Sequence, residues 1–193
     1  MSYFLQGQKI GLRAYDAADF ALVAKWLNDP EVTYYTFSGQ FPTTSDQLAK
    51  SLEKQLASSR NAMFIVCDLA NGNAVGFAGL YEIHPTSHSA EFRVFLGEPG
   101  SRGKGFGTEV AELLMFYGFD RLNLHRVFLG ANAENAGGIR AYEKAGFKHE
   151  GRQRDVIYRN SRYYDGVYMG VLRDEYYATL FDGHRKRFRP DQA

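Results

Sequence analysis

A glycine-rich stretch, residues 97–108, constrains this chain more than any other feature of its sequence. It reads Gly-Glu-Pro-Gly-Ser-Arg-Gly-Lys-Gly-Phe-Gly-Thr, with a strand-like segment before it and a helix-like segment after it. Its last three glycines lack Cβ atoms, so successive backbone N–H groups can point at one place. The helix that begins there adds the positive end of its dipole, and an arginine and a lysine add full charges. The stretch therefore predicts a pyrophosphate site, with the binding residues Arg102, Gly103, Lys104, Gly105, Phe106, Gly107 and Thr108.

Other phosphate-binding loops do not fit this spacing. A Walker loop needs Gly, four residues and then Gly-Lys-Ser/Thr, which no register of the stretch supplies. The dinucleotide fingerprint Gly-x-Gly-x-x-Gly fails because its third glycine position falls on Thr108 or Val110. The protein-kinase loop fails on the same count. The pattern that remains is Arg-x-x-Gly-x-Gly from Arg102 to Gly107; a glycine-rich turn with incidental charges is the alternative interpretation.

A second motif follows one expected helix and one expected strand later. Residues 135–147 read Asn-Ala-Gly-Gly-Ile-Arg-Ala-Tyr-Glu-Lys-Ala-Gly-Phe. Together with the loop, this segment resembles the coenzyme A site of the GNAT N-acetyltransferase superfamily, in which an Asn begins a helix and Tyr-Glu-Lys-x-Gly-Phe ends it. Residues 123–127, 150–152 and 165–166 are similar to the RimJ/RimL-like branch. Gly137 and Gly138 depart from the family pattern, where bulkier residues are usual.

The resemblance implies an acetyl-CoA-dependent enzyme in which an amine attacks the thioester directly in a ternary complex. It implies that Tyr142 is the general acid, because a Tyr at this position points at the thioester sulfur; packing beneath the sheet is the competing interpretation. Asn135 would bind the pantetheine arm, although helix capping alone explains an Asn there. A splayed strand would expose backbone groups to the pantetheine and the thioester carbonyl, at Val94, Phe95 and Leu96.

The order of expected elements predicts the fold class. Apolar patterns indicate strands at residues 9–15, 62–68, 74–83, 89–96, 126–131, 148–157 and 163–172. Helical spacing indicates a first helix, capped by Asp16 or Asp19 and ended by residues 28–30, and further helices at about residues 44–58, 108–122, 136–145 and 174–181. Strands and helices alternate but hairpins also occur, so we expect a mixed α/β sheet of about seven strands with helices on both faces. The resemblance implies the GNAT fold, splayed between the fourth and fifth strands.

The general base is expected on the fourth strand. An alkylamine has a pKa of about 10.4 and arrives protonated, so its proton must be accepted directly or through water. Glu91 is the first candidate, because it shares one strand face with Arg93 by period-two alternation. Glu82 and His84 are alternatives, and an Arg-paired or solvated carboxylate is the competing interpretation of Glu91.

No metal site is expected, since Pro85 separates the only closely spaced histidines, His84 and His88.

The acceptor pocket is expected from aromatic and charged residues outside the cofactor motifs. Aromatic rings with a few carboxylates can hold an amine or a sugar ring, although such rings more often pack in a core. The residues assigned to acceptor binding are Tyr34, Tyr35, Glu82, His84 and Arg93.

Composition indicates which binding partners and which cellular compartment to expect. The 193 residues carry a formal net charge of +1, so no bulk field favours nucleic acid or membrane as the main partner. The single cysteine, Cys67, permits no disulfide within the chain, and we find no signal-peptide pattern and no apolar run of about 20 residues. We therefore expect a cytoplasmic protein with one N-acetyltransferase domain, residues 1–181, and a polar basic tail, residues 182–193. A homodimer is compatible with the resemblance.

Three functions fit these observations. The first is acetylation of a primary amine of a small molecule, such as an amino sugar, a polyamine or an amino-acid-like compound. The second is acetylation of a protein N-terminus, such as that of a ribosomal protein. The third is a non-catalytic acetyl-CoA sensor, against which Tyr142 argues.

Overall fold

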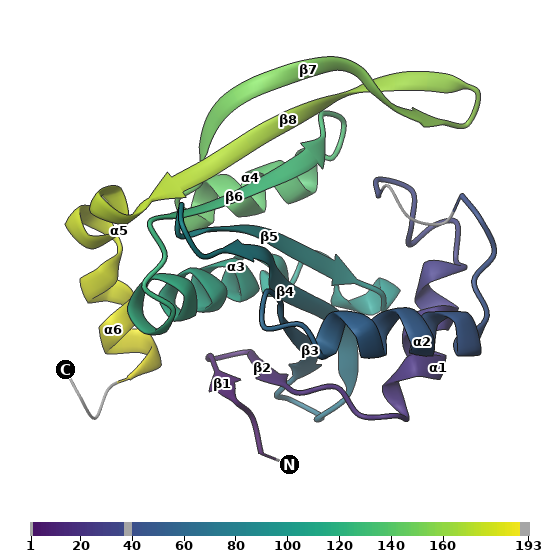
Figure 1. The fold of residues 1–193 in the computed structure, drawn as a ribbon, viewed down its shortest axis with the longest axis horizontal. Coiled ribbons are helices and arrows are strands. Elements are labelled where there is room, and N and C mark those ends of the chain that lie inside the picture. Colours follow the sequence, from purple (N-terminus) through teal and green to yellow (C-terminus); the bar gives the residue numbers. More distant parts are fainter. Residues whose placement is uncertain (1, 37–39, 190–193) are drawn as a thin grey trace.

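The computed structural model describes residues 2–36 and 40–189, which fold around a single mixed sheet (Figure 1). The sheet has eight strands in the order β1-β2-β3-β4-β5-β6-β8-β7. Every neighbouring pair is antiparallel except β5 and β6, which are parallel. The expected mixed sheet is confirmed, with the short β1 as a strand that the sequence patterns did not predict. The strands are Leu5–Gln6 (β1), Ile10–Arg13 (β2), Ala62–Asp68 (β3), Ala74–His84 (β4), Ser89–Leu96 (β5), Arg126–Asn132 (β6), Lys148–Arg159 (β7) and Arg162–Leu172 (β8).

The sheet divides between β5 and β6. Their ladder pairs Ser89 with Arg126, Ala90 with Val127 and Glu91 with Phe128, and it stops there. On its other side β5 stays paired with β4 as far as Leu96, and β6 stays paired with β8 as far as Asn132. Beyond Glu91 the two strands therefore diverge, which is the splay expected between the fourth and fifth predicted strands.

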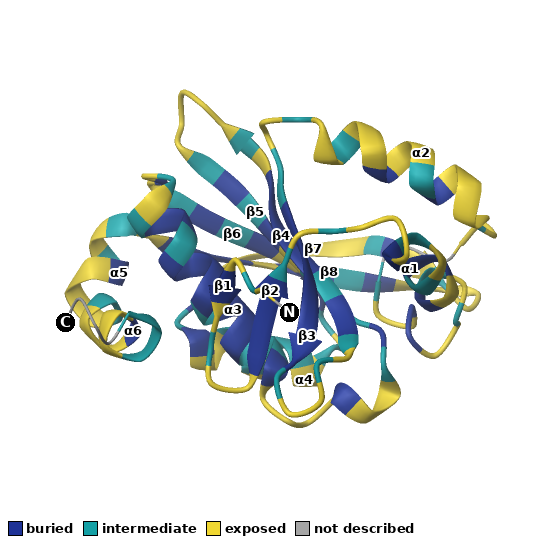
Figure 2. Ribbon diagram, turned by 90° about the horizontal axis from the view of Figure 1, so that it is seen from below, coloured by how far each residue is buried: buried dark blue, intermediate teal, exposed yellow. Residues whose placement is uncertain are grey.

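Helices cover both faces of the sheet, and alternation along β3 separates the faces. Phe64 and Val66 belong to a core with α3 (Phe106–Phe116), α4 (Ala136–Ala145) and α5 (Arg173–Thr179). Met63, Ile65 and Cys67 belong to a smaller core with α1 (Asp19–Leu27) and α2 (Ser45–Leu56). Figure 2 shows the central strands buried between these layers, with α2 exposed except along one stripe. Odd-numbered and even-numbered residues of β3 therefore lie on opposite faces of the sheet.

Local chemistry explains where the helices begin and end. Thr44 caps α2: its hydroxyl accepts from the Gln47 N–H at 3.2 Å, and the Gln47 side chain accepts from the Thr44 N–H at 3.1 Å. Gly146 ends α4 in the left-handed conformation, with φ of 104°, which glycine adopts at little cost. The helix predicted at 108–122 begins earlier, at Phe106, and passes at Phe116 into a short π-helical segment, Tyr117–Arg121.

The C-terminal segment differs from its prediction. The helix expected at residues 174–181 is two helices, α5 and α6 (Phe181–Phe188), and α6 occupies residues that were expected to form a polar tail. The apolar side of α6 explains this, because Phe181 stacks on Phe116 of α3, Phe188 lies tilted against the same ring, and His184 is buried. Residues 190–193 of the expected tail lie outside the described residues.

Among the residues that the structure describes, no helix is both long enough and apolar enough to cross a membrane.

Candidate active site

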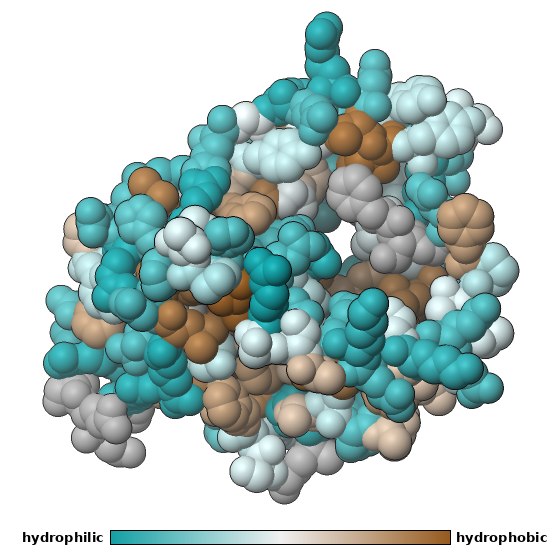
Figure 3. Space-filling model, in the orientation of Figure 1, coloured by the Kyte–Doolittle hydropathy of each residue, from teal (hydrophilic) through white to brown (hydrophobic). Residues whose placement is uncertain are grey.

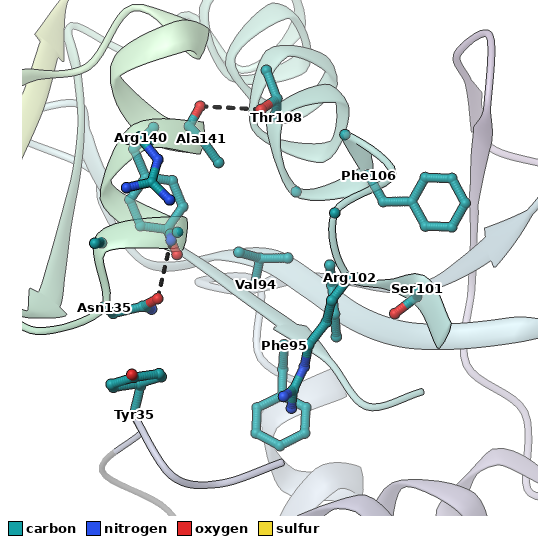
Figure 4. Close-up of a pocket in the computed structure, with 18 of the residues that line it drawn as sticks. Tyr35, Val94, Phe95, Ser101, Arg102, Phe106, Thr108, Asn135, Arg140 and Ala141 are labelled. Atoms are coloured by element: carbon teal, nitrogen blue, oxygen red, sulfur yellow. Dashed lines mark hydrogen bonds between the residues drawn. The ribbon is translucent and has the colours of Figure 1, made fainter. Parts of the chain in front are cut away.

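The splay opens into a cavity of about 580 Å³, a volume typical of small-molecule sites. Its walls come from β5, from the glycine-rich loop with the start of α3, from α4, and from the segment that follows α1. Figure 4 shows these walls facing one another, and the space-filling view shows the molecule hollowed beneath the arch of β7 and β8 (Figure 3). The predicted residues that line it are Val94, Phe95, Leu96, Arg102, Gly103, Gly105, Phe106, Gly107, Thr108, Asn135, Tyr142 and Tyr35.

The glycine-rich loop has the backbone geometry that an anion site requires. Gly103 and Gly105 have φ values of 75° and 84°, a left-handed region that other residues rarely adopt. Gly105 is also the N-cap of α3, so the first amides of that helix are directed at the cavity together with its positive dipole end. The Arg102 guanidinium lies beside the loop and donates to the Glu31 carbonyl at 3.2 Å. These features fit a pyrophosphate group.

Asn135 begins α4 on the opposite wall. Its side-chain oxygen accepts from the Gly138 N–H at 3.0 Å, so the capping role is present in the structure. A Cβ atom at Gly138 would lie 2.6 Å from the Asn135 amide nitrogen, whereas one at Gly137 would meet nothing within 4 Å. The cap therefore explains the glycine at 138, which departs from the resemblance, and leaves Gly137 without a steric reason. Where the two helices meet beside the cavity, Thr108 Oγ1 donates to the Ala141 carbonyl at 3.3 Å and ties α3 to α4 (Figure 4).

Tyr142 lies further along α4 on the same wall of the cavity, and its side chain is partly buried against the core. Its ring contacts Phe92 of β5 and Phe147, which follows α4. Burial raises the pKa of Tyr142 to about 12. The phenol is therefore protonated throughout the neutral range, which is the form that can donate a proton.

The backbone of β5 provides the third wall. Val94, Phe95 and Leu96 pair with β4 on one side and border the cavity on the other, beyond the last pair with β6. Backbone N–H and C=O groups on that edge are thus available to a ligand, as β-sheet edges offer them to peptides.

Several predicted residues lie outside the cavity lining. Glu91 and Arg93 form an ion pair at 2.6 Å, and Arg93 also lies 3.6 Å from Glu82 and over the ring of Tyr81. Because Tyr81 is the register partner of Glu91, this acidic cluster lies on the α1–α2 face of the sheet, just before the splay.

The remaining three predicted residues have other surroundings. His84 lies at the β4–β5 turn, where its Nδ1 accepts from the Thr86 and Ser87 amides at 3.3 and 3.1 Å. Tyr34 stacks edge-on with Tyr35 beside the cavity. Lys104 lines a neighbouring polar pocket of about 440 Å³ instead, and its ammonium lies over Phe106.

The cavity also includes residues that sequence reasoning missed. Arg140 and Lys144 line it from α4, one helical turn apart and on the side that carries Ala136, Gly137 and Ala141. Their four-residue spacing could have been recognised once Asn135 was taken as the start of the helix, and the two side chains add two positive charges to the site. Glu134, Ser101, Val32 and Thr36 complete the missed lining, and no local pattern indicated them.

Comparison with known proteins decides the family. The acetyltransferase (GNAT) domain family matches residues 9–148, well over half of the chain. The chain belongs to the GNAT acetyltransferase family. This GNAT protein is 30% identical over 168 residues to the spermidine N(1)-acetyltransferase of Vibrio cholerae, covering 87% of this chain and 95% of that one. The crystal structure of a spermidine N-acetyltransferase from Vibrio cholerae in complex with CoA and spermine aligns with a TM-score of 0.81 at 30% identity, covering 88% and 98% of the two chains.

A third relative matches over a shorter part of both chains. A putative ribosomal N-acetyltransferase of Bacillus subtilis is 31% identical over 108 residues, 56% of this chain and 58% of that one. Family, fold and site together make this chain an acetyl-CoA-dependent N-acetyltransferase, and the predicted cofactor is confirmed.

Proposed function

We propose that this acetyltransferase acetylates a primary amine of a polyamine or a similar small aliphatic amine. The proposal is supported by the likeness to spermidine N-acetyltransferases over nearly the whole of both chains. The observation on this chain that carries it is the acidic cluster on the α1–α2 face of the sheet, beside the splay. Glu82 and Glu91 share the single guanidinium of Arg93, so the cluster has an excess of negative charge beside the splay. A polyamine arrives as a multivalent cation and is attracted by that charge.

The cofactor side has a proposed division of labour. The glycine-rich loop, residues 102–108, would bind the pyrophosphate through its amides and Arg102. Asn135 and the free edge of Val94–Leu96 would hold the pantetheine, and the same backbone edge would polarise the thioester carbonyl. Arg140 and Lys144 would face the remaining phosphate charge from α4.

The chemical step would use three proton transfers. Glu91 would first take the proton that the ammonium of the acceptor must lose, directly or through water, so that a neutral amine attacks. As the amine nitrogen bonds to the thioester carbon and the C–S bond breaks, Tyr142 would give its proton to the sulfur, and the nitrogen would return its second proton to the Tyr142 phenolate through water. Tyr34 and Tyr35 would border the acceptor, with Glu82, Arg93 and His84 on its other side.

The protein's organisation is also proposed. Residues 1–181 would form the catalytic domain, with residues 182–193 as an appendage whose first part is helical, and two copies would associate as a homodimer. The buried Cys67, which forms no disulfide, suits a reducing cytoplasm.

A panel of acceptors tests the function. Thiol release from acetyl-CoA would be followed with spermidine, spermine and putrescine, with amino sugars, and with peptides bearing free N-termini. We expect turnover with the polyamines. Turnover confined to peptides would overturn the polyamine assignment and favour protein N-terminal acetylation, which the putative ribosomal relative represents.

A further inference from the structure

A buried carboxylate lies within the first turn of α3, close to the expected pyrophosphate. Glu109 is only 2% exposed. Its oxygens accept the backbone N–H of Lys9 at 3.1 and 3.2 Å, and they also accept the N–H of Gln8. A Cβ at Gly7 would lie 2.1 Å from this carboxylate, so the turn between β1 and β2 is closely fitted to it. The N-terminal hairpin is thus fastened to the helix that follows the cofactor loop.

The charge of Glu109 opposes the function of the loop. A carboxylate one turn from the helix start repels the pyrophosphate that the dipole and Arg102 attract. Arg187 of α6 offsets part of it: its guanidinium lies 3.9 Å from Glu109 and donates to Glu112 at 2.6 Å. A second cation lies beside the loop and comes from the hairpin turn that binds Glu109.

That cation is Lys9, and it contacts the loop directly. Its ammonium donates to the Lys104 carbonyl at 3.0 Å and lies 3.6 Å from the place where a Cβ of Gly105 would be. The Lys104 carbonyl and the Gly105 N–H belong to one planar trans peptide, so they point in opposite directions. Holding the carbonyl toward Lys9 therefore turns the Gly105 N–H away from Lys9, and Gly105 lines the cavity.

We propose that Lys9 is a positioning residue for acetyl-CoA binding: it fixes the Lys104–Gly105 peptide so that the loop amide faces the pyrophosphate, and its positive charge lies beside the loop that binds this anion. The proposal rests on the assignment of this loop to the pyrophosphate. Lys9 does not touch the reacting atoms, so its contribution is to the affinity for the phosphate-bearing part of acetyl-CoA.

The test compares Lys9→Met and Lys9→Arg with Lys50→Met, a matched loss of one positive charge at an exposed position of α2. We expect Lys9→Met to raise the Kd for CoA, measured by calorimetry, and the KM for acetyl-CoA about tenfold, which corresponds to about 1.4 kcal/mol. The kcat at saturation stays unchanged, Lys9→Arg recovers part of the loss, and Lys50→Met shows none.

A truncated donor distinguishes positioning from a general loss of structure. S-acetylpantetheine lacks the pyrophosphate, so its kcat/KM should be the same in Lys9→Met and the wild type. Equal losses with both donors, or unchanged binding of CoA, would overturn the proposal. Gly105→Ala belongs in the same series: if it weakens CoA binding while Lys9→Met does not, only the role of Lys9 fails, and if neither variant weakens it, the pyrophosphate assignment of the loop fails as well.

Discussion

The ring of Tyr142 lies edge-on to the ring of Phe92, with centroids 6.0 Å apart and planes at 79°. Phe92 belongs to β5 beside the splay, and Tyr142 reaches it from the second turn of α4, so the contact joins the two walls of the cavity. Edge-on packing fixes the direction of a phenol ring, and burial raises the pKa of Tyr142 to about 12. A protonated and oriented hydroxyl is the arrangement that a proton donor to the sulfur requires.

Tyr142→Phe tests that role. The variant keeps the ring contacts with Phe92 and Phe147 and loses only the hydroxyl, so we expect kcat to fall by roughly 10²-fold or more while the Kd for CoA stays the same. Steady-state kinetics and calorimetry measure the two quantities. Turnover that stays at the wild-type level across the pH range would remove Tyr142 from the mechanism and leave it a packing residue.

The two glycines of α4 form a matched pair for a second prediction. Gly138→Ala would place a Cβ 2.6 Å from the Asn135 amide and disturb the cap, while Gly137→Ala would meet nothing within 4 Å. Loss of an N-cap costs about 1 kcal/mol, so Gly138→Ala should lower Tm by several degrees and raise the KM for acetyl-CoA. Gly137→Ala should leave Tm unchanged or raise it, because alanine favours helix by up to about 1 kcal/mol.

Thermal unfolding of the two variants, with and without CoA, provides the measurement. Equal Tm values for both would show that Asn135 and Gly138 do not act together. A normal KM in a Gly138→Ala protein of lowered Tm would separate the cap from cofactor binding and remove Asn135 from the proposed pantetheine contacts.

The cofactor side could be predicted from the sequence because its chemistry is local. Positive φ at Gly103 and Gly105, the cap at Asn135 and the position of Tyr142 seven residues later all follow from short stretches whose spacing survives folding. The acceptor side could not be predicted in the same way. The Glu91–Arg93 pair lies within β5, and an Arg-paired Glu91 was one interpretation of the sequence. The contact of Arg93 with Glu82 joins two strands and depends on the register of β4 with β5.

The contacts of the N- and C-terminal segments could not be predicted from the sequence either. The contacts of Lys9 with the loop and of Arg187 with Glu112 join residues about 75 to 95 positions apart, and no periodicity signals them. The basic residues of α6 suggested a solvated tail, because charge dominates their composition. Phe181, His184 and Phe188 lie along one side of the helix, and burying apolar surface on Phe116 favours a packed helix despite the basic residues.

Glu91→Gln tests the acidic cluster. The substitution keeps the shape of the side chain and removes both the charge that Arg93 neutralises and the proton acceptor. We expect the kcat with spermidine to fall by about 10²-fold, with the KM for acetyl-CoA unchanged. Glu82→Gln is the control: it should raise the KM for spermidine and leave kcat near the wild-type value. A wild-type kcat in Glu91→Gln would assign the base to another residue.

The last prediction concerns stability at acid pH and arises from α6. His184 is buried between Phe181 and Phe188, and its Nδ1 lies 3.2 Å from the Tyr176 hydroxyl. Burial, with a smaller contribution from the nearby Arg187 charge, lowers the pKa of His184 to about 4 from 6.5. Between these two values the unfolded chain binds the proton and the folded chain does not, so stability is complete above pH 6.5 and falls as the pH drops toward 4.

The loss has an upper limit on the order of 3 kcal/mol, from about 1.36 kcal/mol for each unit of pKa difference. We expect Tm to decline between pH 6.5 and pH 4.5 in the wild type and to decline less steeply in His184→Leu, which places an apolar side chain against Tyr176 and Phe188. Calorimetric unfolding at a series of pH values compares the two slopes. The same slope in both proteins would mean that His184 already accepts its proton in the folded state, and the acid sensitivity would then belong to carboxylates such as Asp165 and Glu175, whose pKa values are lowered by Arg152 and Lys148.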